Sequence, residues 1–132
     1  MKALSIRPPW PWLIIRGLKP VENRGWKSSY RGPLLIHAAT SWEEEACHWL
    51  QKHLPTHLAG MPADLAGHHP GCIVGRVEMY FCTTVHESVF FTGPYGFCFK
   101  NAVEFKDPVP VRGQLGIFNV PDELITEAGG LK

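Results

Sequence analysis

Short segments in which hydrophobic and polar residues alternate are the most regular pattern along the chain, and a period of two predicts β-strands. Residues 72–82 alternate most cleanly, with an apolar face formed by Ile73, Val77, Met79 and Phe81. The opposite face is polar and carries Arg76, Glu78 and Tyr80. Further strands are predicted at residues 3–6, 21–24, 33–39, 97–105 and 113–120.

Two segments have helical spacing instead. Residues 10–16 follow Pro9, which suits the first turn of a helix, and Gly17 is placed to end it in a left-handed conformation, leaving Lys19 at the mouth of the next segment. Ser41 and Glu44 have the form of a capping box before an apolar stripe formed by Trp42, Ala46, Trp49, Leu50 and Leu54. The three glutamates at 43–45 would favour the positive end of that helix dipole.

The order of these elements predicts an α+β, mainly β fold over residues 1–132 as a single domain. Residues 55–71 are rich in proline, glycine and histidine and are expected to form a loop or insertion, and a last short helix should begin near Pro121. Many short strands with close turns favour a small β-barrel decorated by short helices.

Composition narrows the class of protein. The chain has 132 residues, of which 45% are hydrophobic, so it can bury a core. It has no apolar run near the ~20 residues that cross a bilayer, and no signal-peptide pattern, which predicts a cytoplasmic protein without a membrane partner. Its cysteines, at positions 47, 72, 82 and 98, are widely separated and are expected to be reduced thiols.

Charge is unevenly distributed along the chain. Residues 1–31 carry seven basic and one acidic side chain, a formal charge of +6, while the remainder carries −5. This asymmetry favours an anionic partner, with phosphate the first candidate, if folding gathers the cations on one face. If folding disperses these cations over the surface, the charge asymmetry does not indicate an anionic partner.

The densest cluster is Lys19, Glu22 and Arg24. On a strand, Glu22 and Arg24 point to the same face. Arg24 suits two-pronged binding of a phosphate or carboxylate, and Lys19 offers a compact charge or a reactive amine. Glu22 could accept hydrogen bonds from a base edge, act as a general base, or simply pair with the two cations.

Aromatic residues near turns supply a second feature of a nucleotide site, because exposed rings stack on unpaired bases. Trp12 has the helical spacing of a core residue, whereas Trp26 and Tyr30, beside Lys27 and Arg31, are predicted to be partly exposed. The predicted ligand-binding residues are Arg7, Trp10, Lys19, Glu22, Arg24, Trp26, Lys27, Tyr30, Arg31 and Tyr95.

Several other kinds of site are disfavoured. The histidines and cysteines near positions 47–57 and 68–72 do not reproduce a paired-ligand zinc pattern, so no metal or cofactor is predicted. The chain also has no Gly-x-Ser-x-Gly motif and no glycine-rich phosphate loop.

The Gly-x-Lys-x-x-Glu-x-Arg pattern at Gly17, Lys19, Glu22 and Arg24 resembles the signature of the ASCH (activating signal cointegrator homology) domain family of the PUA-like superfamily. Further blocks at residues 4–10, 23–26, 30–38, 71–78, 93–97 and 113–118 resemble bacterial single-domain members. Members related to the coactivator often have Gln where this chain has Pro8. The resemblance implies a PUA-like β-barrel with a cleft beside the motif.

The resemblance also implies a partner: RNA, DNA or a modified nucleoside. Two hypotheses follow. The first is a module that binds RNA, single-stranded DNA or a modified nucleotide. The second is a hydrolase, since some small bacterial relatives hydrolyse N4-acetylcytidine and another type is linked to RNA cleavage. Its catalytic candidates are Lys19, Glu22 and Glu78, although those amidohydrolases have Thr where this chain has Glu22.

Overall fold

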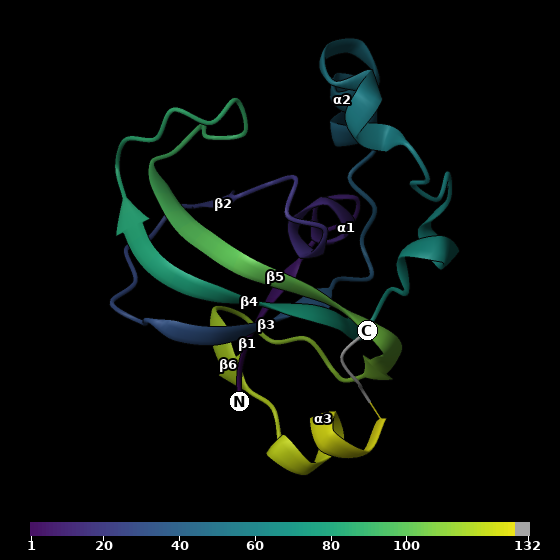
Figure 1. Ribbon diagram of the computed structural model, residues 1–132, viewed down its shortest axis with the longest axis vertical. Helices are drawn as coiled ribbons and strands as arrows, with labels where there is room; N and C mark the ends of the chain where they lie inside the picture. Colours follow the sequence, from purple (N-terminus) through teal and green to yellow (C-terminus); the bar gives the residue numbers. More distant parts are fainter. Residues whose placement is uncertain (129–132) are drawn as a thin grey trace.

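A strongly curved sheet of six strands organises residues 1–128, the part of the chain that the computed structural model describes (Figure 1). The strands are β1 (Lys2–Ile6), β2 (Val21–Arg24), β3 (Gly32–Ala38), β4 (Cys72–Thr83), β5 (Tyr95–Pro110) and β6 (Ile117–Asn119). Their order is β2-β5-β4-β3-β1-β6, with β1 and β3 parallel and the other neighbours antiparallel. The predicted fold class, a mainly β, α+β fold of the barrel type, is confirmed as a curled half-barrel.

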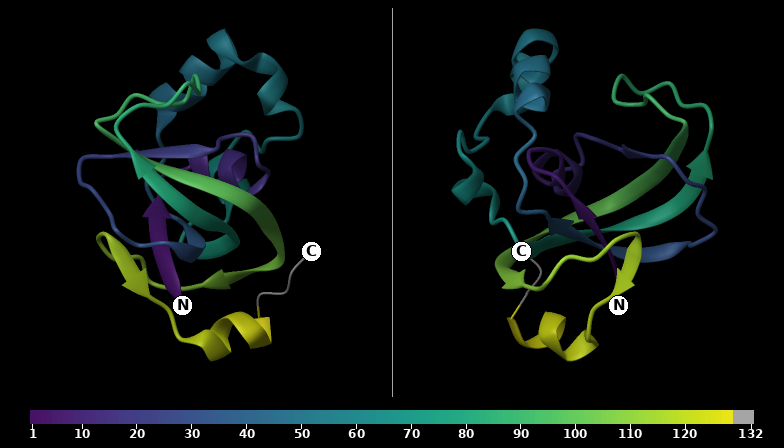
Figure 2. Two further views of the ribbon diagram at one scale, coloured as in Figure 1. Left: turned by 60° about the vertical axis from the view of Figure 1, so that its left-hand side comes forward. Right: turned by 180° about the vertical axis from the view of Figure 1, so that it is seen from behind.

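Short helices surround this sheet. They are α1 (Trp10–Ile15), α2 (Glu44–His53) and α3 (Asp122–Ala128), with 3-10 turns η1 (Pro55–Leu58) and η2 (Leu65–His68). Helix α1 contacts β3, β4 and β5 on the concave side of the sheet, whereas α2 stands away from the strands and α3 lies at the opposite end of the molecule (Figure 2). No helix within residues 1–128 is both long and apolar enough to span a membrane.

Burial explains why α1 is fixed in place. Its Ile14 and Ile15 pack with the inner face of the sheet around Phe97, Leu34 and Ile36. The other side of α1 joins a separate cluster, in which Trp12, Leu13 and Val21 pack against Leu50 of α2 and against Phe90. Trp12 is therefore a core residue, as predicted, and α1 connects the sheet to α2.

Gly17 ends α1 as the sequence predicts. It adopts a left-handed φ of 75°, and its amide donates to the Ile14 carbonyl over 3.0 Å. The amides of Leu18 and Lys19 both donate to the carbonyl of Leu13, so the chain turns back sharply under the helix. Lys19 therefore lies just before β2 and outside both elements, as predicted, and the return of the chain buries it.

The predicted capping box is wrong. Helix α2 begins at Glu44, and no side chain caps it. Ser41 is exposed and Trp42 precedes the helix, so the buried part of the predicted stripe consists of Ala46 and Leu50. The physical reason is position: the Glu43 amide donates to the Pro8 carbonyl, outside the helix, and Ser41 lies three residues before Glu44, too early in the chain to be the N-cap residue.

The predicted alternation of buried and exposed residues also breaks down at the end of β4. Phe81 was predicted on the apolar face but is 53% exposed. The register between β4 and β5 shifts between Met79 and Phe81, and such an irregularity changes the face to which the following residue points. The strand predicted at 113–120 is confined to β6, because Gly116 turns the chain with a φ of 66°.

Gly75 of β4 has no room for a side chain between β5 and helix α1. A Cβ atom there would lie 2.4 Å from the Val103 carbonyl oxygen and 2.8 Å from Ile15 Cγ2. Gly75→Ala is expected to lower the free energy of unfolding by about 1–3 kcal/mol through overpacking, measured by urea unfolding. Gly25→Ala is the matched control, since nothing lies within 4 Å of its Cβ position. Equal losses in the two variants would contradict this account of the packing.

Candidate functional site

Lys19, Glu22 and Arg24 form one hydrogen-bonded network in the structure. Lys19 Nζ donates to Glu22 Oε1 over 2.8 Å and to the Val21 carbonyl over 2.7 Å. Glu22 Oε2 accepts from Arg24 Nη2 over 3.0 Å, which confirms that Glu22 and Arg24 share a face of β2. Lys19 is only 3% exposed and Glu22 8%, so each depends on the other for charge compensation.

This Lys19–Glu22–Arg24 network carries a net positive charge and unused hydrogen-bond capacity. Both carboxylate oxygens of Glu22 are bonded, whereas an ammonium group with two acceptors retains a third N–H. Arg24 Nη2 also donates to the Ser5 carbonyl over 3.0 Å. Arg24 Nε is buried and makes no hydrogen bond within residues 1–128, an arrangement that costs about 1–3 kcal/mol unless a ligand satisfies it.

The network lines a cavity of about 620 Å³, which we call the first cavity. Its walls come from the end of β1, the start of α1, strand β2, helix α2 and the loop that joins β4 to β5. Its size falls in the range typical of small-molecule sites. Segments far apart in the sequence therefore build a single pocket around the motif.

Helix α2 supplies one wall because two bonds fix its start. The Glu43 amide donates to the Pro8 carbonyl over 2.9 Å, and the Trp10 indole donates to Glu43 Oε2 over 2.9 Å. Phe90 contacts Trp10 edge-on with ring centroids 6.1 Å apart, and Trp49 with centroids 6.2 Å apart. The cavity thus has an aromatic side formed by Trp10, Trp49 and Phe90.

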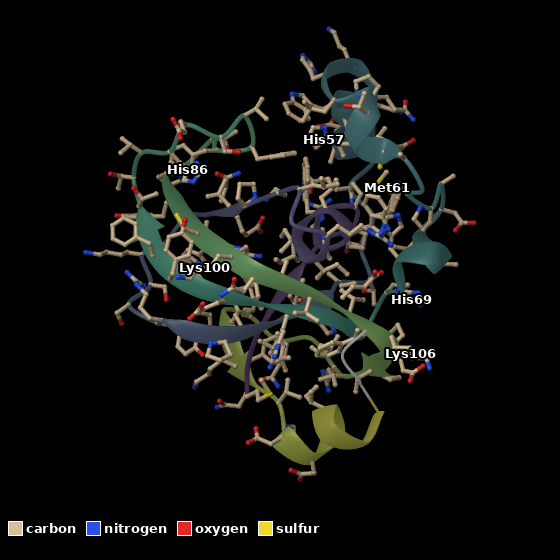
Figure 3. All side chains as sticks on the ribbon, viewed as in Figure 1. His57, Met61, His69, His86, Lys100 and Lys106 are labelled. Carbon is tan, nitrogen blue, oxygen red and sulfur yellow. The ribbon has the colours of Figure 1, made fainter. Side chains whose placement is uncertain are left out.

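Asn23 holds the β4–β5 loop (residues 84–94) over the cavity. Its Nδ2 donates to the Phe90 carbonyl over 2.9 Å, and its Oδ1 accepts from the amides of Thr92 and Gly93 over 2.8 and 3.0 Å. The side chain between Glu22 and Arg24 is therefore a loop anchor. In Figure 3 this loop, with His86, and the segment after α2, with His57, lie on two sides of α1.

The first cavity is lined by equal numbers of cations and carboxylates, but not all of them are paired. Three cations, Arg7, Lys19 and Arg24, and three carboxylates, Glu22, Glu43 and Glu45, line it. The side chains of Arg7 and Glu45 are exposed, and neither side chain makes an ion pair or hydrogen bond within the described part of the chain. The site can therefore bind a ligand that presents both acceptors and donors.

Five of the predicted ligand-binding residues meet in this cavity, and the others do not. The five are Arg7, Trp10, Lys19, Glu22 and Arg24. Trp26, 39% exposed, and Tyr30 line a separate, shallow cavity beside β6. Tyr95 lies opposite Arg24 in the register of β2 and β5 but does not line the first cavity.

The remaining predicted residues also lie elsewhere. Lys27 is exposed outside the first cavity, and Arg31 donates to the Ser28 and Tyr30 carbonyls, with its guanidinium 5.8 Å from the Phe81 ring centroid. The Glu78 side chain is 43% exposed on β4 and accepts from Asn101 over 2.9 Å. Glu78 does not line the first cavity.

Sequence reasoning missed half of the site. Glu43, Glu45 and Trp49 of the α2 segment and Phe90 of the β4–β5 loop line the cavity, although none was predicted as a ligand-binding residue. Trp49 was visible as part of the apolar stripe of the helix, but that pattern does not distinguish a core contact from a pocket wall. No pattern marks Phe90.

The cysteines and possible metal ligands are the other groups that could carry chemistry. All four cysteines are free thiols, as predicted, and burial raises the pKa of Cys47, Cys72 and Cys98, which keeps them protonated. Within residues 1–128 no group of three or more His, Cys, Asp or Glu side chains is placed to hold a metal ion.

A curved sheet of six strands with a cavity beside its edge strand β2 defines a small, mainly β domain of the half-barrel type. Residues 4–97 match the ASCH domain, and the chain belongs to the ASCH domain family. The chain is similar to human "Activating signal cointegrator 1", with 28% identity over 92% of this chain, and to the mouse protein of that name, with 26% identity over 92%. It spans 22% of the length of each of these relatives.

Proposed function

We propose that this ASCH domain binds a nucleotide, within RNA or single-stranded DNA or carrying a modified base, in the first cavity. The ASCH family is associated with RNA binding. The observation that carries the proposal is the pairing of unused cationic donors on Lys19 and Arg24 with the aromatic side of the same cavity. Nucleotides combine an anionic acceptor with a flat ring, which are the two features this arrangement complements.

Each part of the cavity has a role in this proposal. A base stacks on the aromatic side formed by Trp10, Trp49 and Phe90, and Arg24 contacts the phosphate. Glu45 supplies a carboxylate acceptor for a base amino group, because it is exposed and lines the cavity, whereas Glu22 is buried. The geometry supports structural pairing as the role of Glu22: it orients Lys19 and Arg24.

Salt dependence tests this proposal. Titrating labelled single-stranded RNA and DNA of one sequence at about 50 and 200 mM salt should show weaker binding at the higher concentration, because phosphate contacts release counterions. Arg7→Ala should weaken binding severalfold and reduce the salt dependence. Lys106→Ala is the matched control, since Lys106 is an exposed cation on β5 far from the first cavity (Figure 3). Absent binding, or affinity indifferent to salt, would overturn the proposal.

A hydrolase remains the alternative because one observation favours it. Lys19 retains an N–H beside carboxylates in the first cavity, an arrangement that can stabilise a developing oxyanion. Glu78 would have to act from outside the first cavity, so Glu43 and Glu45 are better placed to carry a proton. The binding proposal predicts no release of cytidine from N4-acetylcytidine, whereas release abolished by Lys19→Met would establish the alternative.

A further inference from the structure

A second cavity, of about 870 Å³, lies on the other side of Arg24. It is bounded by the ends of β1 and β3 and by residues 110–116, which connect β5 to β6. Ser5 and Arg24 line both cavities, so the two spaces share part of one wall. A ligand whose ring lies in the first cavity can therefore place a neighbouring group beside Arg24.

The two cavities differ in charge. Three carboxylates line the first cavity, whereas no Asp or Glu is among the described residues that line the second. Arg24 and Arg112 give the second cavity its charge, and Arg112 is exposed and makes no ion pair within residues 1–128. An anionic group is therefore better accommodated in the second cavity, away from Glu22, Glu43 and Glu45.

A buried hydrogen-bond relay fixes the wall that carries Arg112. His37 is 2% exposed; its Nδ1 shares a hydrogen bond with the Ser5 hydroxyl over 2.8 Å and its Nε2 donates to the Val111 carbonyl over 2.7 Å. A carbonyl can only accept, which makes Nε2 the donor in that bond. Gly113 approaches so closely that a Cβ atom there would lie 2.8 Å from His37 Cε1. The residues on both sides of Arg112 are thus held against the sheet.

We propose that the second cavity is a phosphate site, in which Arg24 and Arg112 bind the phosphate of the nucleotide whose base occupies the first cavity. This inference rests on the proposed function and specifies its ligand. The Arg24 side chain is 23% exposed and offers guanidinium donors for this contact, although its Nε is buried. The preferred ligand is then a nucleotide phosphate, as a monoester or as the diester of a strand, and a free nucleoside lacks half of the recognised groups.

Calorimetric titration with cytidine, cytidine 5′-monophosphate and a cytidine-containing dinucleotide tests the phosphate site. The monophosphate should bind at least about tenfold more tightly than cytidine, as expected for hydrogen bonds to a charged group. Arg112→Gln should remove most of this advantage and leave cytidine binding unchanged, while Lys106→Gln changes neither. Equal affinity for the monophosphate and the dinucleotide would show that the protein recognises the phosphate common to both. Tighter binding of one of them would show whether the natural ligand is a monoester or the diester of a strand.

Three results would overturn the phosphate site. If cytidine and its monophosphate bind equally well, or if Arg112→Gln weakens both to the same extent, the second cavity does not bind the phosphate although the first binds the nucleoside. If no nucleoside or nucleotide binds, the proposed function fails together with this inference. Inorganic phosphate provides an independent measurement: it should compete with the monophosphate for the wild-type protein and much less for Arg112→Gln.

Discussion

Glu22→Gln is expected to lower the free energy of unfolding by about 3–5 kcal/mol, the usual cost of leaving a buried charge without its partner. The glutamine keeps the size of the side chain but removes the charge that compensates Lys19, which is 3% exposed. Lys19 Nζ would keep the Val21 carbonyl and an amide oxygen as acceptors, and neither carries a compensating charge. Urea unfolding followed by tryptophan fluorescence measures the loss directly.

Two further variants distinguish the effect of leaving a buried charge unpaired from the effect of removing a carboxylate in general. Glu78→Gln is the matched control, because the Glu78 side chain is 43% exposed and lies 3.9 Å from Lys100; it should change stability by less than about 0.5 kcal/mol. Lys19→Met combined with Glu22→Leu should recover much of the stability lost in Glu22→Gln, since apolar residues can replace a buried ion pair. Similar losses for Glu22→Gln and Glu78→Gln would show that the network is not buried in solution.

Arg24→Met is expected to weaken nucleotide binding about 100-fold, equivalent to roughly 2.7 kcal/mol. Arg24 lines both cavities, and a methionine keeps the aliphatic bulk while removing every donor. The fold should persist, because Glu22 still pairs with Lys19. Fluorescence titration with a labelled single-stranded oligonucleotide measures the change, and circular dichroism verifies folding.

Arg31→Met is the control for this loss of binding. Arg31 belongs to the same basic N-terminal segment, but it bonds backbone carbonyls near Phe81 and lines neither cavity. Its replacement should change affinity by less than about threefold, as expected for screened surface charge. If both variants weaken binding equally, general charge and not the cavity accounts for the interaction.

The sequence predicts best those features that depend on neighbouring residues. Gly17 as a helix terminator, and Glu22 and Arg24 on one face of β2, follow from local backbone geometry alone. The basic segment, by contrast, does not gather on one face: Arg7 and Lys19 reach the first cavity, whereas Arg31 does not. The chain leaves the site where β2 ends, so residues that follow the motif closely in sequence lie away from the first cavity.

The other half of the site depends on contacts between distant segments. Asn23 bonds Phe90, 67 positions further along the chain, and Trp10 bonds Glu43. Such pairings leave no periodic signal, because polar side chains of loops and helix ends have many possible partners. The motif therefore locates the cavity, and tertiary structure supplies its aromatic side.

The five tryptophans offer the most direct test of where a nucleotide binds, because their indole signals report on separate places. Trp10 and Trp49 line the first cavity, whereas Trp12, Trp26 and Trp42 each line a different one. In ¹H–¹⁵N spectra recorded during titration with cytidine 5′-monophosphate, the account predicts that the indole signals of Trp10 and Trp49 shift while the other three stay in place. Shifts confined to Trp26, or no shift at any indole, would contradict it.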